Sequence, residues 1–134
     1  AVHDLARVPQ CYNGPVVVLV DGMTYSTAEM VAAILQDHAM ARVVGVDSRT
    51  GGGGGSPWHL DIFYRLTKEP LLSRAPDAPA LQMAVRRCFR TGKNADVLLE
   101  NTGVVPDILH SPSRRDLLEG DVDLITRVMN LFDK

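Results

Sequence analysis

The sequence predicts an α/β fold with a mostly parallel central sheet, a β-hairpin and a C-terminal helix. Two observations predict the sheet. Residues 16–20 read Val-Val-Val-Leu-Val, a continuous apolar run that is typical of a central strand buried on both faces of a parallel sheet. A helical pattern and a second apolar run, at residues 41–46, follow directly, so residues 15–46 are predicted to form a βαβ unit with a right-handed crossover.

The helix of this unit is predicted over residues 27–37. Its alanines favour a helix, and its larger apolar residues recur at helical spacing. These larger residues are Met30, Val31, Ile34 and Leu35. The turn signal Asn-Gly-Pro at residues 13–15 marks where the first strand begins. With 134 residues, 46% of them apolar, the chain is long enough for a single domain, residues 1–134, with a buried core.

A run of glycines, residues 51–55, follows Arg49 and Thr50. Strand-like segments flank the run, so a flexible linker here would divide one sheet, and a functional glycine loop is the better interpretation. Without Cβ atoms, such a loop lets backbone or substrate approach closely. No Lys-Ser/Thr pair follows it, and Pro57 does not open the helix of a dinucleotide fingerprint, so the sequence argues against nucleotide binding.

The second half of the chain predicts a hairpin and a terminal helix. Residues 58–65 alternate between apolar and polar, which favours a strand or hairpin arm, and the prolines of residues 69–79 indicate a surface loop. Residues 81–90 predict a long strand that turns through Thr-Gly-Lys-Asn into a short strand at residues 97–99. An amphipathic helix that packs on the core is predicted at residues 121–133.

Composition argues against several classes of function. The formal net charge is -2 and the basic residues form no extended patch, so neither nucleic acid nor an anionic membrane is an expected partner. Cys11 and Cys88 stand in unrelated contexts and the histidines lack metal-ligand spacing, so we expect no disulfide framework, no metal and no cofactor. No apolar stretch is long enough to cross a bilayer, so we expect a soluble chain; its compartment is open, and a periplasmic or secreted parent protein would fit.

Ser26 is the most informative single residue. It lies in Met23-Thr-Tyr-Ser-Thr-Ala-Glu29, where the first predicted strand gives way to the helix. A serine on such a turn can face a cleft as a nucleophile, and the free N–H groups of the first helical turn can stabilise a negative charge that forms beside it. The same residues, Ser26-x-x-Glu29, also form a capping box, in which the serine only satisfies helix N–H groups.

Several motifs in sequence order resemble the C-terminal processing, or tail-specific, serine peptidases, a family that includes the tricorn core protease and the interphotoreceptor retinoid-binding modules. The first strand and the nucleophile turn of that family resemble Gly14-Pro-Val-Val-Val-Leu-Val-Asp21 and Tyr25-Ser-Thr-Ala-Glu-Met30. The helix end, the second strand and the Arg-Thr-x-Gly loop resemble Gln36-Asp37, Arg42-Val-Val-Gly45 and Arg49-Thr-Gly-Gly52. The Val-Glu-Asn-x-Gly-Val-x-Pro-Asp signature resembles Leu99-Glu-Asn-Thr-Gly-Val-Val-Pro-Asp107.

This resemblance implies a crotonase/ClpP-like βαβ architecture and a serine peptidase. It implies that Ser26 is the attacking serine, with capping as a secondary role, and that the N–H of Thr27 is one oxyanion donor. The glycine loop becomes a substrate loop, represented by Gly51, Gly52 and Gly53. Peptide bonds of a peptide or protein substrate would then be cleaved through an acyl-enzyme.

The resemblance also indicates a branch of the family. In the processing-protease branch a lysine lies in the glycine loop, and this chain has none there. The tricorn-like branch instead has an upstream histidine as the base and a glutamate that helps to position the catalytic apparatus. Glu100 matches that glutamate; taken alone, it reads as an ordinary surface carboxylate at a hairpin end. His59 is a candidate base only through its nearness to the glycine loop.

An upstream base implies that this chain is the C-terminal part of a larger catalytic domain and is inactive alone. Asp37 and Asp107 are expected to hold loop and helix geometry, while Arg49 and Thr50 brace the glycine loop against the hairpin. An open sheet edge would favour a homo-oligomer. Two alternatives remain open: a non-catalytic ligand-binding module of the same fold, and a crotonase-like acyl-thioester enzyme.

Overall fold

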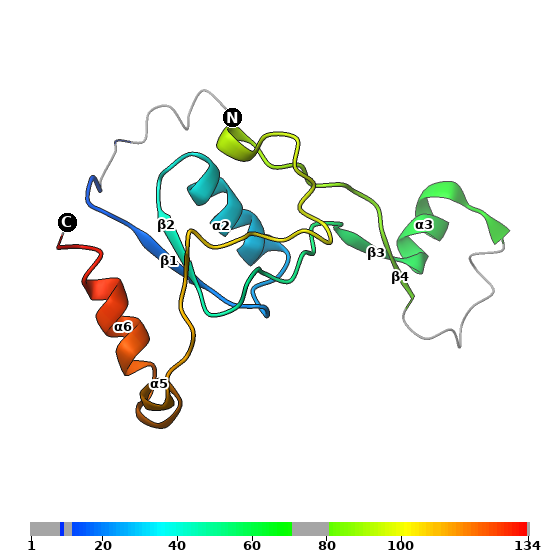
Figure 1. Cartoon of the computed structure of the whole chain (residues 1–134). Coiled ribbons are helices and arrows are strands. Elements are labelled where there is room, and N and C mark those ends of the chain that lie inside the picture. The colour runs from blue at the N-terminus through cyan, green and yellow to red at the C-terminus, as the bar shows by residue number, and fades with distance from the viewer. Residues whose placement is uncertain (1–8, 10–11, 71–80, 134) are drawn as a thin grey trace.

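A parallel sheet forms the centre of the molecule in the computed structural model, which describes residues 9, 12–70 and 81–133 (Figure 1). Its strands are β1 (Val17–Val20), β2 (Arg42–Gly45) and β5 (Ile108–Leu109), in the order β1-β2-β5. Both pairings are parallel, with Val18 opposite Val43 and Val44 opposite Ile108. The predicted α/β class and the parallel βαβ unit are confirmed.

Helices cover both faces of this sheet. The helix α2 (Thr27–Asp37) has the predicted bounds, and its Ala32 and Ala33 pack with Val43 in one core cluster. On the other face, Val44 packs with Leu124 and Val128 of α6 (Val122–Met129). Val43 and Val44 of β2 therefore face opposite helical layers, as the alternation of side chains along a strand requires.

The first strand is not central, contrary to the prediction from its apolar run. Among the described strands, β2 lies in the middle and β1 has a neighbour on one side only. Val17 and Val18 contact the two core clusters on opposite faces, whereas Leu19 is 45% exposed. The apolar run thus reflects contact with both helical layers and gives no information about the position of the strand within the sheet.

Residues 57–67 form a short strand and a helix, so the strand predicted over residues 58–65 is wrong. The strand β3 (Pro57–His59) pairs antiparallel with β4 (Gln82–Ala84), and α3 (Leu60–Thr67) follows it at once. Asp61 and Arg65 form an ion pair of 2.8 Å at helical spacing. Leu60, Phe63 and Tyr64 also fit a helical period, so alternation alone could not decide between the two structures.

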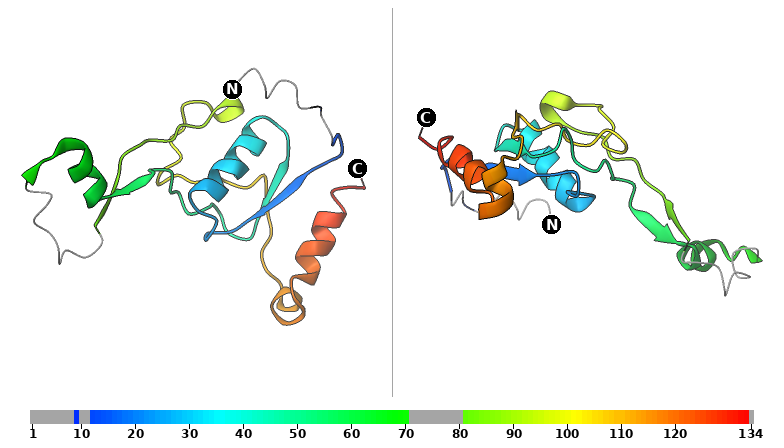
Figure 2. Two further views of the ribbon diagram at one scale, coloured as in Figure 1. Left: turned by 180° about the vertical axis from the view of Figure 1, so that it is seen from behind. Right: turned by 60° about the horizontal axis from the view of Figure 1, so that its bottom comes forward.

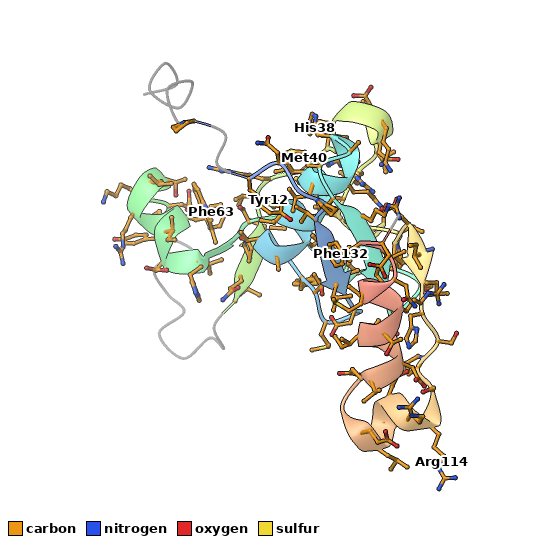
Figure 3. The ribbon with its side chains drawn as sticks, turned by 90° about the vertical axis from the view of Figure 1, so that its left-hand side faces the viewer. Tyr12, His38, Met40, Phe63, Arg114 and Phe132 are labelled. Atoms are coloured by element: carbon orange, nitrogen blue, oxygen red, sulfur yellow. The ribbon has the colours of Figure 1, made fainter. Side chains whose placement is uncertain are left out.

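The arm formed by β3, α3 and β4 projects away from the layered body in each view (Figure 1 and Figure 2). Phe63 lies on this arm, whereas Arg114 marks the tip of the C-terminal helical pair (Figure 3). The surface loop predicted at residues 69–79 falls outside the described residues from residue 71 onward. No helix in the described part of the chain is long and apolar enough to cross a membrane.

The hairpin predicted over residues 81–99 is much shorter than expected. The strand β4 ends at Ala84, and further along only an isolated bridge joins Phe89 to Leu98 among the described residues. Between them lies a 3-10 turn, η1 (Gly92–Asn94). Arg90, which precedes this turn, is buried against the C-terminal end of α2, and its N–H donates across the turn to the Val97 carbonyl at 2.8 Å.

Two helices close the chain where one was predicted. The helix α5 (Arg114–Glu119) begins with a complete capping box between Ser113 and Asp116, and Gly120 ends it with a φ of 75°. The predicted terminal helix corresponds to α6, which ends at Met129 and buries Leu124 on the core as expected. The predicted end at residue 133 is therefore too late.

Asp116 joins these two helices, and its lowered pKa indicates that the stability of the protein depends on pH. A hydrogen bond donated by the N–H of Ser113 lowers its pKa most; burial opposes this, and donors from Leu124 and His110 lower the pKa further. The folded pKa lies below the unfolded one, so the unfolded state binds more protons in acid. This contribution to stability is therefore present above the ordinary aspartate pKa and is lost as the pH falls below it.

We expect the free energy of unfolding, measured in urea, to fall between about pH 5 and about pH 3. Asp116→Asn should be less stable at neutral pH and should show a smaller fall, because the titrating carboxyl is gone. An equal fall in both proteins would show that other groups control the acid response.

Candidate active site

The site is built on the turn that connects β1 to α2. Asp21 organises this turn, because its Oδ1 atom accepts hydrogen bonds from the N–H of Met23 (3.0 Å) and from the N–H of Thr24 (2.7 Å). The N–H of Gly22 donates to Asp47 at 2.7 Å, which ties the turn to the segment after β2. The turn therefore has a fixed geometry as it enters the helix at Ser26.

Ser26 has a strained backbone and a hydroxyl that does not cap the helix. Its φ of 57° and ψ of -123° lie outside the regions that residues with a Cβ usually adopt. Its side chain makes no capping hydrogen bond, so the predicted capping role is wrong. A serine on a sharp, strained strand-to-helix turn is the arrangement that exposes a nucleophilic hydroxyl.

The backbone next to Ser26 offers free hydrogen-bond donors. Within the described residues, no acceptor is seen for the N–H groups of Thr27 and Ala28, and the first helical bond runs from Met30 N–H to the Ser26 carbonyl at 3.0 Å. Free donors at a helix start can stabilise an oxyanion beside the serine. The predicted role of Thr27 fits this arrangement and stays a prediction.

Glu29 connects the helix α2 to the glycine loop. Its side chain is fully buried, and its carboxylate accepts hydrogen bonds from the Thr50 hydroxyl, from Gly52 N–H (2.7 Å) and from Gly53 N–H (2.7 Å). The residue taken for the second half of a capping box is thus a bridge between two segments. Sequence reasoning missed this role, although a glutamate one turn after Ser26 and a nearby glycine run were the available signals.

The glycine loop lies against the turn between β1 and α2 and against the segment after the hairpin. The Tyr25 ring occupies the space that a Cβ on Gly51 or Gly53 would need. Gly52, with a φ of 72°, accepts a hydrogen bond from Asn101 N–H at 2.7 Å. The close backbone approach predicted for this loop is confirmed, and contact of Gly51, Gly52 and Gly53 with substrate stays a prediction.

Thr50 anchors the base of the same loop, as predicted. Its hydroxyl accepts from Val104 N–H at 2.8 Å, and its own N–H donates to the Val104 carbonyl at 3.0 Å. Arg49 contributes less, with one long hydrogen bond of 3.5 Å to the carbonyl of Thr102. The loop is therefore bound to the segment that carries Glu100.

Glu100 lies beside the glycine loop with one carboxylate oxygen unsatisfied. Its Oε1 accepts from Cys88 N–H at 2.7 Å, whereas its Oε2 is buried and has no hydrogen-bond partner among the described residues. A Cβ added to Gly54 would come within 3.4 Å of its Cδ. Burial raises the pKa of the Cys88 thiol, and the charges of Glu100 and Glu29 raise it further. Both carboxylates thus lie close to one thiol.

The other predicted residues have structural roles or lie elsewhere. Asp37 binds Arg90 and Asn94, while Asp107 accepts from the N–H of Val43 at 2.9 Å, as expected for residues that hold helix and loop geometry. His59 lies on the projecting arm, where its Nε2 is 3.1 Å from the amide nitrogen of Gln82. No group of three potential metal ligands is found among the described residues.

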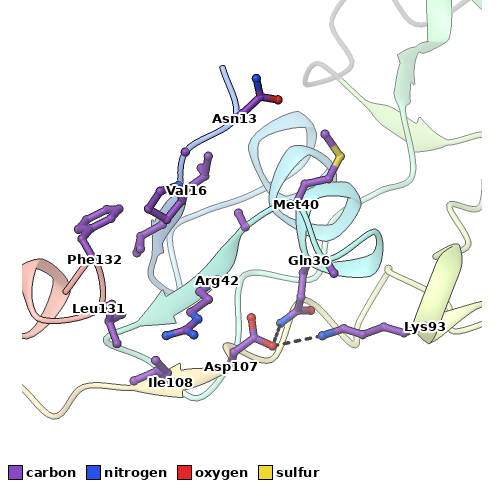
Figure 4. A pocket seen from close by; sticks show the side chains of 15 residues that line it. Asn13, Val16, Gln36, Met40, Arg42, Lys93, Asp107, Ile108, Leu131 and Phe132 are labelled. Atoms are coloured by element: carbon purple, nitrogen blue, oxygen red, sulfur yellow. Dashed lines mark hydrogen bonds and ion pairs between the residues drawn. The ribbon is translucent and has the colours of Figure 1, made fainter. Parts of the chain in front are cut away.

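An open hollow of about 730 Å³ lies at the end of the sheet opposite to Ser26 (Figure 4). Its walls include Val16 and Arg42, which precede or begin their strands, together with Met40 and Phe132. Ser26 follows the carboxyl end of β1, so the hollow and the turn between β1 and α2 lie at opposite ends of the strands.

Comparisons with known proteins identify relatives of the chain. A model of peptidase family S41 matches residues 3–110. Among solved structures, the chain is similar to mature CPAF complexed with lactacystin, with 22% sequence identity and a TM-score of 0.64. This match covers 87% of the present chain and 20% of the other, so the chain spans about a fifth of that protein's length. At this identity, the structural match supports a common fold.

Proposed function

The chain belongs to peptidase family S41, and on this premise we propose that it is the part of a serine endopeptidase catalytic domain that carries the nucleophile, Ser26. The observation that supports this most directly is the state of Ser26. Its strained backbone and uncapped hydroxyl lie next to free N–H groups, a combination that a simple helix cap does not require.

The reaction is acyl transfer. The Oγ atom of Ser26 attacks the scissile carbonyl carbon while a base takes the hydroxyl proton. The N–H of Thr27 stabilises the negative oxygen of the tetrahedral intermediate. Collapse breaks the C–N bond, the amine leaves with the proton returned by the base, and water then releases the acyl group from Ser26.

The base belongs to a segment upstream of this chain. Support comes from Glu100, whose buried Oε2 atom has no donor among the described residues. An unsatisfied buried carboxylate oxygen is costly, and an imidazole N–H from an upstream histidine would satisfy it and orient the base. In this proposal the chain is a part of a larger catalytic domain, lies downstream of the base and is inactive alone.

The finer assignment is a tricorn-like, tail-specific peptidase with a crotonase/ClpP-like architecture. No lysine occurs in residues 49–57, where a Ser-Lys enzyme would need one. An extended peptide would bind along a strand edge, and the side of β1 that has no strand neighbour among the described residues leads directly to Ser26. The same edge would support a homo-oligomer in the isolated chain.

The test is covalent labelling of the full-length protein by a fluorophosphonate, with peptide mapping to find the modified residue. We expect one adduct, on Ser26, and none on the isolated 134-residue chain. Denatured full-length protein is the control, because an unactivated serine does not react at a comparable rate.

An unlabelled, folded full-length protein would contradict the peptidase proposal. In that case, binding of apolar ligands would favour the non-catalytic module. A rise in melting temperature with a coenzyme A thioester would favour the crotonase-like enzyme.

A further inference from the structure

We propose that Glu29 is a positioning residue, which holds the glycine loop and Ser26 in one arrangement and thereby sets the rate of the reaction without touching the substrate. The proposal rests on the proposed function and deepens it. Its physical basis is a fully buried carboxylate that lies one helical turn after the nucleophile.

Each carboxylate oxygen of Glu29 accepts hydrogen bonds from its own set of donors. Oε1 accepts from the Thr50 hydroxyl and from Gly52 N–H, and Oε2 accepts from Gly53 N–H at 2.7 Å. Hydrogen bonds to an ionised acceptor are about twice as strong as neutral ones. Because two consecutive N–H groups bind two different oxygens, the carboxylate fixes the orientation of the loop as well as its distance from α2.

The opposite side of the loop is fixed to the segment that carries Glu100. The Gly52 carbonyl accepts from Asn101 N–H at 2.7 Å, and the Thr50 hydroxyl accepts from Val104 N–H at 2.8 Å. A continuous set of contacts therefore runs from the nucleophile helix, through Glu29 and the loop, to Glu100. A shift of the loop would change the distance between the two proposed catalytic residues.

A glutamine at this position would have nearly the same size but the wrong chemistry. Its amide has one acceptor oxygen and one NH₂ group, so one of the two loop N–H groups would meet a donor. The loop would lose one anchor while the core stays filled. Glu29→Gln therefore tests the position of the loop separately from packing.

The experiment compares three full-length proteins: the wild type, Glu29→Gln and Asp116→Asn. Asp116 is the matched control, because it is also a buried carboxylate that accepts backbone N–H groups, but it lies at the C-terminal helices. The readouts are the rate of fluorophosphonate labelling and the hydrogen exchange of residues 49–56. Melting temperature is measured for all three proteins.

We expect Glu29→Gln to exchange faster in residues 49–56 and to label about 100-fold more slowly, as a misplacement near 1 Å would produce. Asp116→Asn should lower the melting temperature without either local effect. Unchanged exchange in Glu29→Gln overturns the proposal, and so does faster exchange with an unchanged labelling rate. An equal loss of labelling in Asp116→Asn also overturns it.

A second pair of variants applies if Glu29→Gln does not fold. Thr50→Val removes the hydroxyl that donates to Glu29 and accepts from Val104 N–H, and Thr50→Ser retains this hydroxyl. Slow labelling in the valine variant, with a normal rate in the serine variant, supports the proposal; equal rates overturn it. If the wild type itself is not labelled, the proposed function fails, and loop exchange still decides whether Glu29 holds the loop.

Discussion

Replacement of Ser26 by alanine is expected to lower peptidase turnover of the full-length protein by on the order of 10⁴- to 10⁶-fold, the loss that follows removal of a serine nucleophile. Its effect on stability should be small, within about 0.5 kcal/mol, because the Ser26 hydroxyl makes no capping hydrogen bond. Turnover of a peptide library and urea unfolding measure the two effects.

Ser113→Ala is the matched control, and its pattern should be the reverse. Ser113 occupies the same position at the start of α5, but its hydroxyl accepts from Asp116 N–H at 3.1 Å. Its loss should cost about 1 kcal/mol of stability and leave turnover unchanged. A Ser26→Ala protein that keeps its activity, or that is destabilised as much as Ser113→Ala, would return Ser26 to the role of a cap.

Arg90→Met is expected to destabilise the protein by about 3–5 kcal/mol, because it leaves a buried carboxylate without its cation. Arg90 and Asp37 are 8% and 5% exposed, and their closest nitrogen and oxygen atoms are 2.6 Å apart. Burial tends to raise the pKa of Asp37, but Arg90 and Asn94 prevail and the pKa is lowered. In the variant, the buried Asp37 carboxylate must either stay charged without its cation or bind a proton, and either outcome destabilises the folded state.

Arg65→Met provides the comparison for an exposed pair. Arg65 and Asp61 are 2.8 Å apart, a distance close to that of the buried pair, yet their side chains are 74% and 57% exposed. Its loss should cost less than about 0.5 kcal/mol. Urea unfolding of both variants shows whether burial, at a similar distance between the charged groups, determines the loss of stability. Similar losses of free energy of unfolding in the two variants would show that the Arg90 pair contributes no more than a surface ion pair.

Local patterns predicted the parts of the fold that depend on local contacts. The helix α2 has the predicted bounds because its period, alanines and flanking strands all agree. The prediction for the segment from Leu60 to Thr67 was wrong because its apolar residues fit both a strand period and a helical period. The pairing of β3 with β4 ends at His59, and the helix begins at the next residue. The edge position of β1 could not be predicted either, since contact with two helical layers produces the same apolar run.

The candidate site shows the same limit. Ser26 could be found because a strand, a turn and a helix follow each other in sequence. The partners of Glu29 lie 21 to 24 residues further on, so a capping box was the only local interpretation of its carboxylate. The contact between Cys88 N–H and Glu100 could not be predicted either, because it joins a backbone group and a side chain that are 12 positions apart.

The contact between Thr50 and Val104 has a consequence for the order in which the site is assembled on the ribosome. These residues are 54 positions apart, and the glycine loop is held between them and Glu29. A chain that emerges from its N-terminus presents Ser26 long before Val104 is synthesised. Domains generally fold as units during synthesis, so the segment of Glu100 is fixed relative to the proposed nucleophile only after Val104 has been synthesised. A nascent chain that stops short of this point contains Ser26 but lacks the hydrogen bonds between Thr50 and Val104 that anchor the glycine loop.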